Sequence, residues 1–235
     1  MAPRRPGRAG SPEAPAIMAK GWQLATGTGF CEVGGELVFL DLARDKYFSL
    51  RGADRAAFDR LRAGEPNDSE AMMRLERKGL IMPSRTSTAI GPTEIDVPED
   101  DLMATEGRTG LRMIATAACA LRWARRAMRP EHISATVVRL SERKRAVGVP
   151  GAEAAAVSVA AAYAASRWLN PIPPRCLIDA LALDRILLAR GIVTSLVFGV
   201  RMSPFNAHCW LQTPETILTG SAAEARNFTP ILVVG

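Results

Sequence analysis

Residues 170–181 read NPIPPRCLIDAL, and this stretch decides the expected fold because it places a cysteine at the start of a helix. Proline is favoured in the first turn of a helix, so the pattern predicts a helix over Pro173–Arg190, ended by Gly191. The first N–H groups of a helix have no partner within it, and with the helix dipole they favour negative charge. We therefore expect Cys176 to ionise readily, beside N–H groups that could hold an oxyanion.

A possible base for this thiol follows in residues 204–212, PFNAHCWLQ, which read as a half-buried strand. Successive side chains of a strand point to opposite faces, so His208 and Trp210 are predicted on one face and Cys209 on the other. A helix-start cysteine and a strand histidine are the arrangement that papain-like thiol chemistry uses. The alternative is a small core cysteine and a hydrogen-bonded strand histidine.

The small number of histidines and cysteines limits which two residues could form a catalytic pair. The chain has two histidines and four cysteines, and His132 lies in a polar, basic stretch where we expect it to be exposed. Cys119 sits among alanines of a predicted helix and is expected to be buried, and Cys31 lies on a predicted strand far from either histidine in sequence. Cys176 as nucleophile and His208 as general base and acid are the pair that remains.

Composition excludes most other chemistry. The chain is 48% apolar and 23% charged, as in soluble globular proteins, and its net charge of +6 fits an acidic peptide or a nucleic acid without selecting either. Two histidines cannot form a three-histidine zinc site, and the cysteines are too widely spaced for a CxxC pair, so no metal site is expected. We recognise no secretory signal or membrane span, and scattered cysteines fit a cytoplasmic protein.

The N-terminal part reads as strands followed by helices. Residues 1–20 are rich in Pro, Ala, Gly and Arg and are expected to form a disordered basic tail. Three short antiparallel strands are predicted at roughly 28–33, 36–41 and 46–50, with a hairpin turn at Gly34-Gly35.

Helices are predicted next, over Ala53–Arg62 and over Ser69–Gly79, the latter with an N-cap serine and a C-cap glycine. Three strands with three helices would make residues 21–83 a small winged-helix-like domain. Residues 84–107 are polar, contain prolines and are predicted to be a linker.

The C-terminal part, residues 108–235, is predicted to hold helices and then an antiparallel sheet. Helices are expected over Leu111–Met128 and Gly151–Leu169, before the helix of Cys176. Short strands are expected at Val193–Val200, Ala207–Gln212 and Thr216–Thr219. Helices followed by a meander of strands indicate an α+β fold.

Both parts resemble one family. The stretch from Cys176 to Val193, then Leu196-Val-Phe-Gly-Val-Arg201 and Pro204-Phe-Asn-Ala-His-Cys-Trp210, resembles the transglutaminase-like peptidase of lasso-peptide B proteins. Leu40-Asp-Leu-Ala-Arg-Asp-Lys-Tyr-Phe-Ser-Leu50 with Leu75-Glu-Arg-Lys-Gly-Leu-Ile81 resembles the pyrroloquinoline-quinone-D-like recognition element of precursor peptides. Their order in one chain is that of fused B proteins.

The resemblance implies that the N-terminal domain binds the leader of a ribosomally made precursor by β-augmentation, as an added strand beside the third strand and against the last helix. Main-chain hydrogen bonds would then supply affinity, and apolar pockets would supply specificity. The residues implied in leader binding are Lys46, Tyr47, Phe48, Ser49, Leu50, Met72, Leu75 and Glu76.

For the C-terminal domain the resemblance implies a papain- and transglutaminase-like cysteine peptidase that cuts leader from core. The free core N-terminus would pass to a separate macrolactam-forming cyclase of the asparagine-synthetase type. ATP would act through that cyclase, since nothing here resembles a P-loop, and no cofactor is expected on this chain.

One position departs from the family, whose third catalytic residue is an Asp about a dozen residues after the histidine. Here that neighbourhood reads ILTGS, residues 217–221, without an acid. Orientation of His208 could pass to a backbone carbonyl or to one of the side chains of Gln212, Glu215, Thr219, Ser221 and Glu224.

Two other functions stay open. Without the Asp, the chain could be a catalytically impaired scaffold that binds leaders. Alternatively, Arg74, Arg77 and Lys78 could contact phosphates as in a winged-helix nucleic-acid-binding module, although the same domain carries many acidic residues. A peptide partner without nucleic acid or membrane is the expectation that we carry forward.

Overall fold

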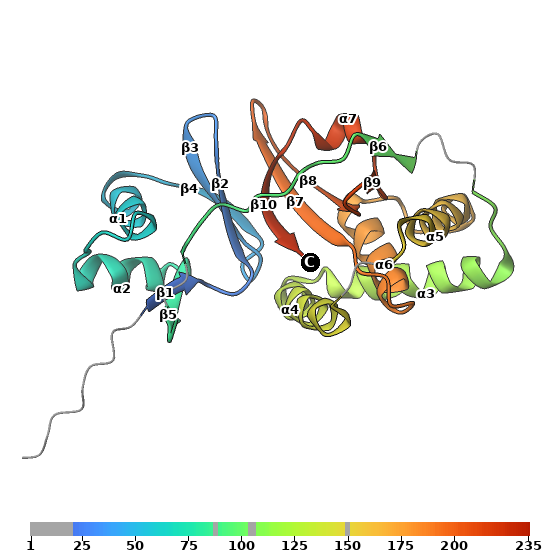
Figure 1. Ribbon diagram of the computed structural model, residues 1–235, viewed down its shortest axis with the longest axis horizontal. Helices are drawn as coiled ribbons and strands as arrows, with labels where there is room; N and C mark the ends of the chain where they lie inside the picture. The colour runs from blue at the N-terminus through green and yellow to red at the C-terminus, as the bar shows by residue number, and fades with distance from the viewer. Residues whose placement is uncertain (1–20, 87–88, 103–106, 149–150) are drawn as a thin grey trace, which may run out of the picture.

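The computed structural model describes residues 21–86, 89–102, 107–148 and 151–235; the predicted tail at 1–20 lies outside these ranges. It is an α+β protein in which an N-terminal unit stands beside a C-terminal unit (Figure 1). We call residues 21–84 the N-terminal unit and residues 108–235 the C-terminal unit.

The N-terminal unit is built on an antiparallel sheet of order β2-β3-β4, formed by Thr28–Val33, Glu36–Asp41 and Lys46–Leu50. The three predicted strands are thereby confirmed. Phe30 and Phe39 point to one face, where they pack with Phe58 of helix α1. Helix α1 spans Gly52–Arg62 and helix α2 spans Ser69–Arg77.

The helices of this unit differ in part from the prediction. Two helices, not three, lie within residues 21–86, so a winged-helix architecture stays a prediction. The N-cap of α2 is Asp68 rather than the predicted Ser69. The carboxylate of Asp68 accepts a hydrogen bond from the Ala71 N–H in the first turn of the helix, as N-cap side chains do. A two-stranded sheet of β1 (Gly21–Leu24) and β5 (Ile81–Ser84) was not predicted.

The second face of the three-stranded sheet is buried against the C-terminal unit. Val38 and Leu40 alternate with Phe39 along β3 and belong to the large core of the C-terminal helices and sheet. At Gly29 the two units approach so closely that a Cβ would overlap the carbonyl oxygen of Ile231. The two units therefore share one hydrophobic core.

The C-terminal unit is built on a sheet of order β10-β7-β8-β9-β6. Its last strand, β6, comes from the segment predicted as a linker and pairs with β9 in parallel, whereas the other pairings are antiparallel. Helix α6 lies against β8, and helix α3 lies against α6 (Figure 1). The strands are β6 (Asp100–Asp101), β7 (Ser195–Met202), β8 (Phe205–Gln212), β9 (Thr216–Ile217) and β10 (Thr229–Val234). The helices are α3 (Leu111–Ala127), α4 (Pro130–Val147), α5 (Glu153–Ser166), α6 (Cys176–Leu188) and α7 (Ala222–Ala225), with a 3₁₀ turn at Arg167–Leu169.

A buried ion pair joins helices α4 and α6. Lys144 Nζ lies 2.9 Å from Asp184 Oδ1, and both side chains are fully buried. The ammonium also donates to the carbonyl oxygens of Thr194 and Val234, at 2.7 and 2.9 Å, beside β7 and at the end of β10. Burial costs two charges their hydration, and these bonds compensate for part of it.

The segment predicted as a linker packs along the C-terminal unit. Its Asp96 carbonyl accepts from Gln212 Nε2 at 2.7 Å, and Thr93 Oγ1 donates to the Ile231 carbonyl at 3.4 Å. Among the residues that the structure describes, no helix is both long and apolar enough to cross a membrane.

Candidate active site

Helix α6 begins at Cys176 itself, three residues later than the predicted Pro173. The two prolines form an extended approach, and Arg175 is the N-cap residue, with φ −143°. Asp179 fixes this entry, since its Oδ2 accepts from the Arg175 N–H at 3.0 Å and its Oδ1 from the Tyr163 hydroxyl at 2.9 Å. The thiol is therefore held in the first position of a helix whose leading N–H groups can meet an anion.

Three groups stabilise the thiolate of Cys176. The hydrogen bond from the Cys209 side chain has the largest effect on the sulfur and outweighs the opposing effect of burial. Weaker hydrogen bonds from the His208 side chain and the Cys209 backbone act in the same direction as the first, and the pKa of Cys176 falls to about 4. The same contact, together with burial, raises the pKa of Cys209 well above its usual value. Cys176 is consequently ionised at neutral pH, while Cys209 keeps its proton and donates it.

The imidazole of His208 lies among aromatic rings on β8. Its ring centroid is 6.0 Å from that of Trp210 and 5.2 Å from that of Phe228. Its Nε2 atom is buried and has no hydrogen-bond partner among the described residues. The nitrogen that serves the Cys176 sulfur is therefore Nδ1.

Glycine occupies the position next to this unpartnered nitrogen. A Cβ at Gly220 would lie 3.6 Å from His208 Nε2 and 4.0 Å from Glu224 Oε2. Gly220 has φ +79°, a left-handed conformation that favours glycine. The absence of a side chain here leaves the far side of the imidazole without an orienting group.

The candidates for that orienting role are mostly engaged elsewhere. Gln212 accepts from Trp210 Nε1 at 2.7 Å, and Thr219 Oγ1 accepts from the Leu211 N–H at 2.9 Å. Ser221 Oγ caps α7 by accepting from the Glu224 N–H.

Two acidic candidates remain. Glu215 is exposed in the turn between β8 and β9. Glu224 has a side-chain oxygen 4.0 Å from the position that a Cβ at Gly220 would take.

A cavity of about 420 Å³ opens beside the thiol. Cys176, His208 and Gly220 line it together with Tyr163 and Arg167. A cavity of this size fits a peptide segment next to a nucleophile.

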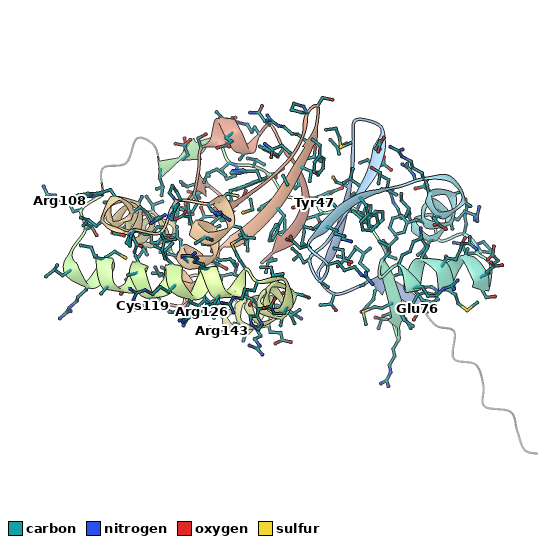
Figure 2. The ribbon with its side chains drawn as sticks, turned by 180° about the vertical axis from the view of Figure 1, so that it is seen from behind. Tyr47, Glu76, Arg108, Cys119, Arg126 and Arg143 are labelled. Carbon is teal, nitrogen blue, oxygen red and sulfur yellow. The ribbon has the colours of Figure 1, made fainter. Side chains whose placement is uncertain are left out.

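The residues predicted to bind a leader differ in how far they are exposed. Strand β4 is the outer strand of its sheet and has one unpaired edge among the described residues; Lys46 on it is exposed, and Ser49 is half-buried. Phe48 half-buries its ring against Phe39, whereas Glu76 is exposed on α2 (Figure 2). Buried in the core of the unit are Leu50, Met72 and Leu75.

Tyr47 occupies a different place from the other leader-binding candidates. It points to the opposite face of β4, at the junction of the two units (Figure 2), where its ring lies 5.7 Å from that of Phe205. Burial is the main cause that raises the pKa of Tyr47, and the negative charges of Asp45 and the Cys176 thiolate add to it. Its phenol therefore lies near the candidate nucleophile.

Sequence reasoning missed one contributor to the site and misplaced one cysteine. Cys209 was expected on the face opposite His208, which is where it lies, but that face meets α6 and so brings its thiol to Cys176. Cys119 is exposed on α3 rather than buried, because the buried face of this helix runs through Ala117, Ala120 and Ala124 and Cys119 lies off it (Figure 2). His132 is exposed as predicted.

Comparison with known proteins gives one match. The family model described as the transglutaminase-like superfamily matches residues 113–233, about half of the chain, and this range includes Cys176, His208 and Gly220. Neither the curated proteins nor the solved structures contain a match.

Proposed function

The chain belongs to the transglutaminase-like superfamily, and from this premise we propose that it is a cysteine peptidase that matures a lasso peptide by cutting the leader from its precursor. The observation that carries the proposal is the placement of Cys176 as the first residue of α6, where its pKa falls to about 4. A thiolate at a helix start beside a histidine is equipped for acyl transfer.

The chemistry follows from these positions. The Cys176 thiolate attacks the carbonyl carbon of the last leader residue, and the negative oxygen meets the leading N–H groups of α6. His208 donates a proton to the departing amine, which becomes the N-terminus of the core. Water, deprotonated by His208, then hydrolyses the thioester and releases the leader.

The open edge of β4 supports leader binding by strand addition. Asp45 and Tyr47, at the beginning of β4, line a cavity with Cys176. A leader whose C-terminal end reaches the thiol would therefore run antiparallel to β4. The core would then pass to a macrolactam-forming cyclase, and ATP would act through that partner.

One observation favours a second candidate function, a leader-binding scaffold without peptidase activity. The unpartnered Nε2 of His208 leaves the imidazole without the group that normally fixes its tautomer. Nucleic-acid binding gains less support, because Arg74 and Lys78 both pair with Asp54, at 3.1 and 2.7 Å.

A cleavage assay tests the proposal. The purified chain is incubated with the synthetic short peptide encoded beside its gene, with and without the neighbouring cyclase and ATP, and the products are identified by mass spectrometry. We expect one cut that Cys176→Ala abolishes, while fluorescence anisotropy shows that the variant still binds the leader. Binding without any cut under both conditions would establish the scaffold function instead.

A further inference from the structure

A second cavity lies on the other side of the candidate nucleophile, between the two units. It measures about 120 Å³, and three of its lining residues, Cys176, His208 and Cys209, also line the larger cavity. Its opposite wall comes from the N-terminal unit, with Leu40 and Tyr47. The reactive sulfur therefore lies at the boundary of two hollows, and one of them exists only because both units contribute to it.

The alternation of side chains along β4 brings Tyr47 to this wall. Phe48 and Leu50 point into the core shared with α1 and α2, so Tyr47 must point away from it. There it packs against the large core and against Phe205, which follows the turn between β7 and β8. Residues of both units therefore contact the phenol ring of Tyr47, which lies beside the thiols of Cys176 and Cys209.

The walls of this smaller cavity are mostly apolar. Leu40, Leu42, Ile133 and Phe198 contribute to it, and Asp45 is its acidic member. Its volume is below the roughly 300–1,000 Å³ of cavities that hold whole drug-sized ligands. A single small apolar side chain is the group that such a space accommodates.

We propose that this cavity is a substrate subsite built jointly by the two units, and that Tyr47 determines which side chain next to the scissile bond it accepts. The inference rests on the proposed peptidase function. A peptide whose carbonyl meets Cys176 extends to both sides of the sulfur, so one side chain enters the larger cavity and a neighbouring one meets Tyr47. The N-terminal unit would thereby select the cleavage site as well as hold the leader.

Alkylation of Cys176 tests whether Tyr47 forms a wall of the smaller cavity, and it needs no peptide substrate. Cys119 is the other exposed cysteine of the described residues, so the measurements use a Cys119→Ser background. The readout is the ratio of the alkylation rate constants of N-benzyl iodoacetamide and iodoacetamide. Tyr47→Ala should raise this ratio about tenfold by making room for the benzyl group, and Tyr47→Trp should lower it.

The matched control is Trp22→Ala, which removes another half-buried aromatic ring from the N-terminal unit, away from the cavity. It should leave the ratio as in the parent, which separates loss of the wall from loosening of the unit. A ratio that is the same in the parent and in both Tyr47 variants would overturn the inference.

A peptide experiment tests the selection itself. The probe is the short peptide encoded beside the gene, synthesised as a pool with the residues flanking the cut randomised, and mass spectrometry reports which members are cleaved. Tyr47→Ala should shift the preference at one flanking position towards larger side chains by about tenfold in kcat/KM. An unchanged preference contradicts the inference even if cleavage occurs. If the parent cuts nothing, the peptidase proposal fails, and the alkylation ratio alone decides whether Tyr47 walls the cavity.

Discussion

The two sides of the catalytic pair are built very differently. The thiolate of Cys176 lies at a helix start, and hydrogen bonds from Cys209 and His208 bring its pKa to about 4. On the far side of the imidazole, Nε2 of His208 is buried with no partner among the described residues, next to a glycine. Several groups share the activation of the nucleophile, with the Cys209 side chain foremost, whereas the orienting position depends on one side chain, which this sequence lacks.

Removal of the imidazole is the strongest test of that comparison. His208→Ala should lower kcat about 10³- to 10⁴-fold, because the departing amine loses its proton donor while the thiolate and the oxyanion donors remain. Mass-spectrometric progress curves with the precursor peptide give the rate. The control is His132→Ala, at the exposed second histidine, and a comparable loss there would contradict the assignment.

A carboxyl group introduced beside Nε2 of His208 should supply the missing orienting group. Gly220→Asp should raise kcat roughly tenfold, a fraction of the ~10⁴-fold effect of the Asp in serine protease triads. Gly220→Ala is the matched control, because it carries the same strain at φ +79° without an oxygen. If the Asp and Ala variants are equally active, the unpartnered nitrogen does not limit the rate.

The low pKa of Cys176 predicts how its alkylation rate depends on pH. In the Cys119→Ser background, the alkylation rate of Cys176 by iodoacetamide should be constant above about pH 5 and fall to half near pH 4, where the thiolate takes up its proton. Cys209→Ala removes the main stabilising hydrogen bond, so the pKa of Cys176 rises and the half-point moves to higher pH. Cys209→Ser keeps a donor and should shift it less. Coincident profiles for Ala, Ser and parent would exclude Cys209 from this role.

The smallest effect is expected at Glu224. Its carboxylate lies near Gly220 but makes no hydrogen bond to Nε2, so Glu224→Gln should change kcat by no more than about threefold. The same substitution at exposed Glu215 gives the baseline. A loss approaching that of His208→Ala would move Glu224 into the catalytic machinery and fill the empty side of the comparison.

The sequence predicts those parts of the site that follow from local rules. Prolines before Cys176 predict a helix start, and strand periodicity correctly separates His208 from Cys209. The periodicity does not reveal what each face meets, so the contact between Cys209 and Cys176 could not be foreseen. The same limit applies to Tyr47, whose neighbour Phe205 is distant in sequence.

Among the elements that the sequence analysis did not predict, α4 and β10 were missed for related reasons. Helix α4 is rich in basic residues and reads as a solvated stretch, yet Lys144 within it is fully buried because Asp184, forty positions later, neutralises it. Strand β10 contains Pro230, which argues against a strand but is tolerated here because β10 is the outermost strand of its sheet. Both depend on pairings between distant segments.

The burial of the three-stranded sheet on both faces limits how this protein could be re-engineered. A designer who grafts the N-terminal unit onto another protein would transplant a sheet whose second face, with Val38 and Leu40, packs into the core of this C-terminal unit. The contact between the two units leaves no room for a side chain at Gly29, because the Ile231 carbonyl already fills the space. The N-terminal unit is thus exchangeable only together with the surface that it packs against. Under the proposed function, leader specificity is better altered along the open edge of β4.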